Sequence, residues 1–112
     1  MMEQGKKYLS DILQSITLIE EFVSTLKGFD DYVSDLKTRS AVERQLGIIG
    51  EAVNRLDNLY PDARLPHAKK IISFRNRLIH AYDAVDPTIV WAVIKNYLPA
   101  LKSEVIQKLN NK

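Results

Sequence analysis

Residues 74–82 read FRNRLIHAY and close a segment, 71–82, that has the spacing of an amphipathic helix. At about 100° per residue, Arg75 falls in the middle of the apolar arc of this segment. An unpaired guanidinium among aliphatic side chains costs several kcal/mol. The pattern therefore predicts that a carboxylate, a phosphate or a partner chain meets Arg75. The arc consists of Ile71, Ile72, Phe74, Leu78, Ile79 and Tyr82.

Asn76 and His80 lie four residues apart, so they share a face beside the apolar arc. His80 is about 140° round an ideal helix from Arg75, which is too far for direct contact within one helix. We therefore expect the arginine and the histidine to converge through a bend, a ligand or a second copy of the helix.

The rest of the chain also has helical periodicity. Apolar residues recur every three or four positions over 8–26, with Gly28 as the expected stop, and again over about 38–58. The second of these helices either continues from a short turn capped by Asp30 or Asp31, or starts at a capping box formed by Ser40 and Glu43. Both starts remain open at this point.

Prolines mark the later boundaries. Two of them make 58–66 a loop, and Pro66 suits the first position of the helix that carries Arg75. Asp86 followed by Pro87 is a strong helix start, so the preceding helix must end between His80 and Val85. Pro99 is expected to kink or divide the C-terminal helix.

No hairpin signal or alternating strand pattern occurs, so the sequence predicts an all-α fold. Four or five helices with short links form an antiparallel bundle in which the first two long helices make the core hairpin. We expect residues 1–112 to be a single domain.

Two glycines, Gly47 and Gly50, stand one turn apart in the predicted helix 38–58. Glycine is unfavourable inside a helix, so the pair suggests that another backbone passes close by. Glu51 follows directly and is our candidate partner for Arg75. A solvated helical glutamate is the alternative.

Composition excludes several classes of site. There is no cysteine, and 16 Lys and Arg against 14 Asp and Glu leave a net charge of only +2, so a nucleic-acid site would have to be local. His67 and His80 do not have zinc-site spacing, and we expect no metal and no cofactor. No apolar run reaches the ~18 residues that would cross a bilayer, so a cytoplasmic protein with no membrane contact is expected.

An arginine, a histidine and an asparagine remain, and this set suits a phosphodiester. Histidine exchanges protons near neutral pH, and arginine stabilises phosphoryl charge without a metal. Arg75, His80 and Tyr82 in the spacing Arg-x4-His-x-Tyr resemble the motif of the HepT-like HEPN ribonucleases, toxins encoded beside minimal nucleotidyltransferase antitoxins. Asn76 follows the arginine as it usually does in that family. The resemblance extends over 35–52 and 86–99, which is most of the chain.

This resemblance implies a HEPN fold that forms a homodimer, with two copies of the motif lining one cleft. It implies a metal-independent endoribonuclease in which the 2′-OH of the RNA attacks the adjacent phosphorus. His80 would transfer protons, Arg75 would stabilise charge, and Asn76 would position a phosphate oxygen or His80. Arg77 and Lys70 are weaker candidates, for the RNA backbone, because an ordinary solvated face is the commoner explanation for each of them.

The resemblance also implies a role for Tyr82. The partner nucleotidyltransferase of such toxins transfers AMP to the motif tyrosine and so neutralises the ribonuclease. Two alternatives stay open. One is a non-catalytic HEPN module that binds nucleotide or serves as the helical subunit of a nucleotidyltransferase. The other is a structural dimer in which Arg75 pairs with Glu51 and His80 only caps a helix.

Overall fold

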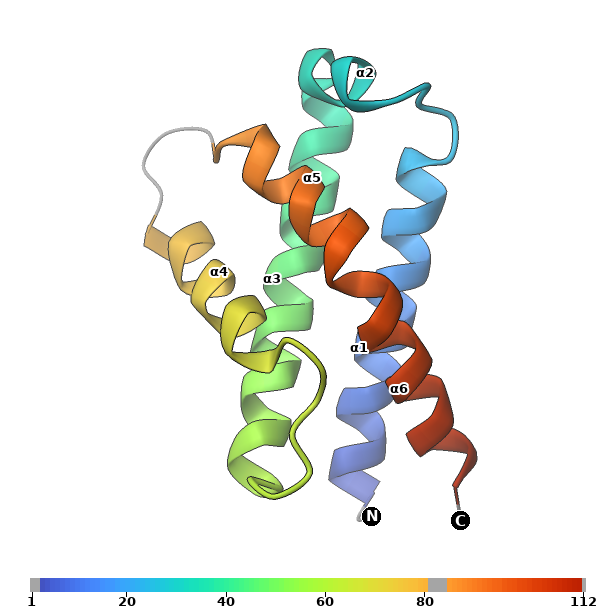
Figure 1. Ribbon diagram of the computed structural model, residues 1–112, viewed down its shortest axis with the longest axis vertical. Helices are drawn as coiled ribbons and strands as arrows, with labels where there is room; N and C mark the ends of the chain where they lie inside the picture. Colours follow the sequence, from blue (N-terminus) through green and yellow to red (C-terminus); the bar gives the residue numbers. More distant parts are fainter. Residues whose placement is uncertain (1–2, 81–84, 112) are drawn as a thin grey trace.

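The computed structural model describes residues 3–80 and 85–111, which form six α-helices (Figure 1). This part of the chain contains no β-strand, so the all-α prediction is confirmed. There are six helices where four or five were expected, because residues 29–34 form a separate short helix and the C-terminal helix is divided near Pro99. The helices are α1 (Glu3–Val23), α2 (Phe29–Ser34), α3 (Leu36–Leu59), α4 (Ala68–His80), α5 (Pro87–Asn96) and α6 (Leu98–Asn110).

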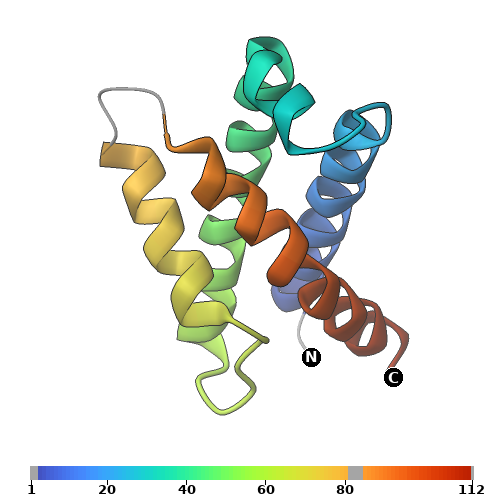
Figure 2. The same ribbon diagram turned by 45° about the horizontal axis from the view of Figure 1, so that its top comes forward.

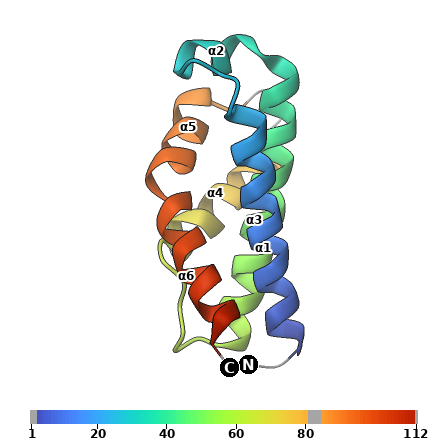
Figure 3. The same cartoon turned by 90° about the vertical axis from the view of Figure 1, so that its right-hand side faces the viewer.

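The two longest helices, α1 and α3, run antiparallel and make the most extensive helix contact, as predicted for the core hairpin. Helix α4 packs along α3, and α6 packs along α1. Helix α2 lies across one end of the bundle, against α3 and α5 (Figure 2). Seen from the side, α1 begins and α6 ends at the opposite end of the bundle (Figure 3).

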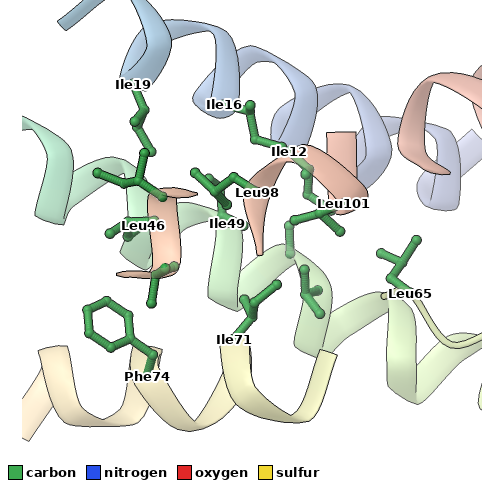
Figure 4. Packing of buried hydrophobic residues seen from close by; sticks show 14 of the residues in the cluster. Ile12, Ile16, Ile19, Leu46, Ile49, Leu65, Ile71, Phe74, Leu98 and Leu101 are labelled. Atoms are coloured by element: carbon green, nitrogen blue, oxygen red, sulfur yellow. The ribbon is translucent and has the colours of Figure 1, made fainter. Parts of the chain in front are cut away.

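Buried aliphatic side chains recur every three or four residues on the long helices, as one apolar face requires. Figure 4 shows side chains from α1, α3, α4 and α6 gathered in one interior. Ile71 and Phe74 anchor α4 in this core and thereby fix the rotation of α4 about its own axis. The labelled core residues are Ile12, Ile16, Ile19, Leu46, Ile49, Leu65, Ile71, Phe74, Leu98 and Leu101.

Helix α3 starts earlier than the capping box at Ser40 would place it. The Asp35 carboxylate accepts hydrogen bonds from the backbone N–H of Thr38 at 3.0 Å and from its hydroxyl at 2.7 Å. Because this cap satisfies the first turn, α3 begins at Leu36 and Ser40 lies inside it. The capping box was therefore the wrong alternative.

Two further boundary predictions were wrong. Helix α1 ends at Val23, before Gly28, because the chain tightens into i→i+3 hydrogen bonds from the N–H of Ser24 to Glu21 and of Leu26 to Val23. Neither Asp30 nor Asp31 caps α2. Its N-cap is Gly28, which offers no side chain, and the Asp31 carboxylate accepts the backbone N–H of Lys27 instead.

Pro66 is not the first residue of α4, because His67 has a φ of 59°, in the left-handed region. The carbonyl of His67 accepts the N–H of Ile71 at 2.9 Å, so the helix begins after it, at Ala68. A left-handed non-glycine residue is strained by about 1 kcal/mol or more, although histidine tolerates this region better than most residues. The His67 ring stacks on Tyr97 with the ring centroids 4.7 Å apart, and this contact holds it there.

The later boundaries are as predicted. The Asp86 carboxylate accepts the N–H of Thr88 at 2.9 Å, and Pro87 is the first residue of α5. Tyr97 separates α5 from α6, with Pro99 in the first turn of α6. Within the residues that the structure describes, none of the helices combines the length and the apolar character that crossing a bilayer would need.

The Asp35 cap predicts a pH dependence of stability. Hydrogen bonds from Thr38, first from its backbone and then from its hydroxyl, lower the pKa of Asp35. A carboxyl whose pKa is lower in the folded state stabilises the fold above the ordinary aspartate pKa, and that contribution is lost as pH falls through the lowered value. Asp35→Asn keeps a capping oxygen but does not titrate. We expect near-normal stability at pH 7 and a shallower loss between about pH 5 and pH 2.

Urea unfolding at a series of pH values measures this difference. Asp62→Asn is the matched control, since the exposed Asp62 side chain accepts no hydrogen bond from a described residue. If the free energy of unfolding of Asp35→Asn fell as steeply towards low pH as that of the unmodified chain, the assignment would be contradicted.

Candidate active site

Arg75 meets Glu51 across the contact between α4 and α3. Nη2 of Arg75 lies 2.5 Å from Oε2 of Glu51, so the pairing predicted from the sequence is confirmed. The side chains are 24% and 38% exposed, which makes the pair partly accessible to water. The interaction is an ion pair and not an aligned hydrogen bond, because Oε2 accepts no hydrogen bond of normal geometry from the described residues. This oxygen is itself buried.

Glu51 also binds a second arginine. Nε of Arg55, one turn further along α3, donates a hydrogen bond to Oε1 of Glu51 at 2.9 Å. This hydrogen bond, with the charge of Glu51, raises the pKa of Arg55. One carboxylate therefore serves two guanidinium groups, and the cluster keeps a net positive charge. Arg55 was missed in the sequence, although its position four residues after Glu51 is typical of a helical ion pair.

Asn76 is the third neighbour of Arg75. Its Oδ1 accepts a hydrogen bond from Nη1 of Arg75 at 3.1 Å. A guanidinium has five N–H donors; Asn76 accepts a hydrogen bond from one of them, and Glu51 pairs with the group by charge. The two residues therefore orient Arg75 and leave it donors for an anionic ligand.

Gly50 explains how α4 comes so close to α3. A Cβ atom built on Gly50 would overlap the Cβ of Arg75, and it would lie 2.8 Å from the Cγ of Arg75 and 3.5 Å from the carbonyl oxygen of Ile71. The root of the Arg75 side chain thus rests on the backbone of α3. The predicted close approach is confirmed at Gly50 but is wrong for Gly47, where a Cβ would meet nothing within 4 Å.

An open cavity of about 690 Å³ adjoins this cluster, between α1, α3 and α4. Exposed aliphatic side chains lie at its edge, Ile48 being 36% and Ile79 56% exposed. Its lining contains equal numbers of positive and negative side chains. One of the negative residues is Glu43, whose pKa is raised by burial. The charged residues of the lining are Arg44, Arg55 and Arg75 on one side and Asp11, Glu43 and Glu51 on the other.

The structure does not bring every predicted site residue to this cavity. His80 is the last residue of α4, is exposed, and does not line the cavity. Arg77 and Lys70 line a different hollow, between α4 and α5. Tyr82 lies outside the described residues. Within one chain, therefore, Arg75, Asn76 and Glu51 gather, and His80 stands apart.

A metal centre would need several acidic or histidine side chains close together. Among residues 3–80 and 85–111, no three His, Asp or Glu side chains gather in a way that could hold a metal ion. The chemistry of the cluster is that of a fixed cation, suited to a phosphate or carboxylate ligand.

Comparison of the sequence with known proteins shows the family to which this chain belongs. The family model for HepT-like ribonucleases ("Ribonuclease HepT-like") matches residues 12–107. A probable ribonuclease HepT of Thermococcus cleftensis is 40% identical, over 93% of this chain and 94% of the relative. A putative RNase of Caldanaerobacter subterraneus subsp. tengcongensis is 36% identical over 93% of each chain. A putative RNase of Methanocaldococcus jannaschii is 33% identical over 89% of this chain and 92% of the relative. None of the solved structures matches significantly.

The two glycines of α3 predict opposite effects of the same substitution. Gly50→Ala forces α4 away from α3 and should destabilise the fold by about 1–3 kcal/mol. Gly47→Ala, the matched control, adds a methyl group in open space and should stabilise α3 by up to about 1 kcal/mol, the difference in helix propensity. Urea unfolding of the two variants measures both effects. Equal changes in stability would show that α4 does not rest on Gly50.

Proposed function

Because this chain belongs to the HepT-like ribonuclease family, we propose that it is a metal-independent endoribonuclease and the toxin of a toxin–antitoxin pair. The observation that carries the proposal is the environment of the Arg75 guanidinium. Its guanidinium is held by Glu51 and Asn76, borders an open cavity, and keeps donors for an anion. Such a group is suited to the charge that develops on a phosphodiester during cleavage.

The proposed reaction uses the RNA's own nucleophile. The 2′-oxygen attacks the adjacent phosphorus and forms a new P–O bond, while the bond from phosphorus to the 5′-oxygen breaks. The proton of the 2′-OH passes to a base, and the leaving 5′-oxygen receives a proton. The products are a 2′,3′-cyclic phosphate and a 5′-OH. DNA is not a substrate, because it lacks the 2′-OH.

We assign the proton transfers to His80 and the stabilisation of charge to Arg75. An imidazole can accept and donate a proton near neutral pH, and such transfer contributes typically 10²–10⁴-fold to a rate. His80 is exposed at the C-terminal end of α4, where an RNA strand can reach it. Its separation from the Arg75 cavity supports a site completed by a second copy of the chain.

The Arg75 cavity is a suitable surface for that second copy. Its lining carries equal numbers of positive and negative groups, as suits contact with a protein, and the exposed Ile48 and Ile79 would be removed from water by a homodimer contact. Arg75 would then lie where this contact meets the RNA cleft. In the proposed homodimer, the motifs of both chains line one cleft, and RNA enters that cleft from outside.

Catalysis gives a direct test. Arg75→Ala and His80→Ala should each lower the rate of cleavage of a single-stranded RNA by at least about 10²-fold. Arg64→Ala is the matched control, because Arg64 pairs with Asp57 at the loop before α4 and does not line the Arg75 cavity. Cleavage should persist in EDTA and leave a 2′,3′-cyclic phosphate. Loss of activity in EDTA would contradict the metal-independent mechanism.

Stability separates this role from a purely structural one. In the alternative of a purely structural dimer, removing Arg75 would cost a few kcal/mol by orphaning a buried carboxylate. Because Glu51 is 38% exposed and keeps Arg55 as a partner, we now expect Arg75→Ala to cost less than about 1 kcal/mol. Unchanged folding with lost cleavage favours catalysis, whereas lost folding would favour the structural dimer.

We propose further that a cognate minimal nucleotidyltransferase neutralises the toxin by transferring AMP to Tyr82. The added phosphate would repel the phosphates of RNA near His80, two residues away. Tyr82→Phe should retain cleavage and toxicity but escape neutralisation when the partner enzyme is present with ATP. Mass spectrometry of the modified chain measures the transfer, and full neutralisation of Tyr82→Phe would reject Tyr82 as the acceptor.

One observation also fits a second function. Arg75 already has an anionic partner and His80 does not line its cavity, as would suit a non-catalytic HEPN module that binds nucleotide or acts as the helical subunit of a nucleotidyltransferase. Binding of nucleotide by the purified chain, without cleavage of RNA and with loss of binding in Arg75→Ala, would favour this alternative.

A further inference from the structure

A second hollow, of about 270 Å³, lies between α4 and α5, away from the Arg75 cavity. Three cationic side chains line it, Lys69, Lys70 and Arg77, together with Ser73 and the ring of Tyr97. No carboxylate of the described residues lines it. We call it the basic hollow.

The charges of the basic hollow are not compensated. All three cations are exposed, and none of them forms an ion pair within 4 Å with a carboxylate in the described part of the chain. The Arg75 cavity, by contrast, carries equal numbers of arginines and carboxylates. A concave surface lined by charge of one sign concentrates the electrostatic potential and attracts ligands of the opposite sign.

Tyr97 gives the hollow a fixed aromatic wall. Its half-buried ring stacks on His67, and the Nζ of Lys70 lies 5.4 Å from the centre of the ring. A cation–π contact of this kind holds the ammonium group near the ring. This contact favours positions of the Lys70 ammonium group beside the hollow.

The positions along α4 lead from the hollow to His80. Lys70, Ser73 and Arg77 follow one another at three- and four-residue steps, and His80 comes three residues later. Lys70 and Arg77 are about 10 Å apart along an ideal helix axis, the length of about three phosphates in a stacked strand. Round the helix, His80 is about 60° from Arg77 but about 140° from Arg75. His80 lines neither hollow, but by helix angle it projects closer to the Arg77 side of α4 than to the Arg75 side.

We propose that the basic hollow binds the sugar–phosphate backbone of the RNA substrate beside the cleaved bond and leads the strand along α4 to His80. This inference rests on the proposed ribonuclease function. Lys69, Lys70 and Arg77 neutralise successive phosphates, and Tyr97 supplies a wall against which a ribose or base packs. The contacts are to the backbone, so they raise affinity without selecting a sequence.

Binding without cleavage tests the hollow first. In the His80→Ala chain, a fluorescein-labelled, 2′-O-methylated single-stranded RNA is titrated by fluorescence anisotropy at several salt concentrations. Lys70→Ala with Arg77→Ala should weaken binding about 10-fold. It should also lower the slope of log affinity against log salt by about 1.4, because two fewer phosphates are neutralised at about 0.7 each.

The matched control is Lys6→Ala with Lys37→Ala, which removes the same charge from exposed positions on α1 and α3 outside the hollow. It should change the affinity less than 2-fold. Equal effects of the two double variants, or no effect of either on affinity and slope, would overturn the proposal.

Cleavage kinetics in the unmodified background complete the test. Lys70→Ala with Arg77→Ala should raise KM about 10-fold and leave kcat within about 3-fold. If kcat collapses and KM stays unchanged, the hollow is not a binding surface. If the unmodified chain cleaves no RNA, the proposed function fails, but the anisotropy titration still decides whether the hollow binds RNA.

Discussion

The contact between Arg75 of α4 and the Gly50–Glu51 step of α3 is the constraint on which the candidate site depends. Gly50 lets α4 come close, and Glu51 then provides the charge that Arg75 needs once it is drawn against the bundle. Neither would suffice alone. With a side chain at position 50, α4 would move outward, and without a carboxylate at 51, a guanidinium so close to the core would lack its counter-charge.

Helix α4 divides two surfaces of different character. On the α3 side, balanced charges and exposed aliphatic groups suit a second protein chain. On the α5 side, cations around Tyr97 that pair with no carboxylate of the described residues suit a polyanion. His80 stands at the end of the helix between them. One short helix thus separates the surface proposed for assembly, where Arg75 would meet the cleaved phosphodiester, from the surface proposed to hold the neighbouring RNA backbone.

The sequence predicted features that follow from helical periodicity and from the need of a charge for a partner. It missed features that depend on the path of the folded chain. A charge within an apolar arc requires a partner, which made the pairing of Arg75 with Glu51 predictable. The sequence could not distinguish Gly50 from Gly47, because only the path of α4 decides which of them is covered. The left-handed His67 depends on Tyr97, thirty residues later, and the basic hollow depends on the same ring.

The two ends of the helical chain, at the start of α1 and the finish of α6, lie together at the extremity of the bundle that α2 does not cover (Figure 3). Another folded module fused at either point would emerge far from the C-terminal end of α4 and the first turn of α5. Gene fusion could therefore attach new partners to this scaffold while the faces on either side of α4 stay unobstructed.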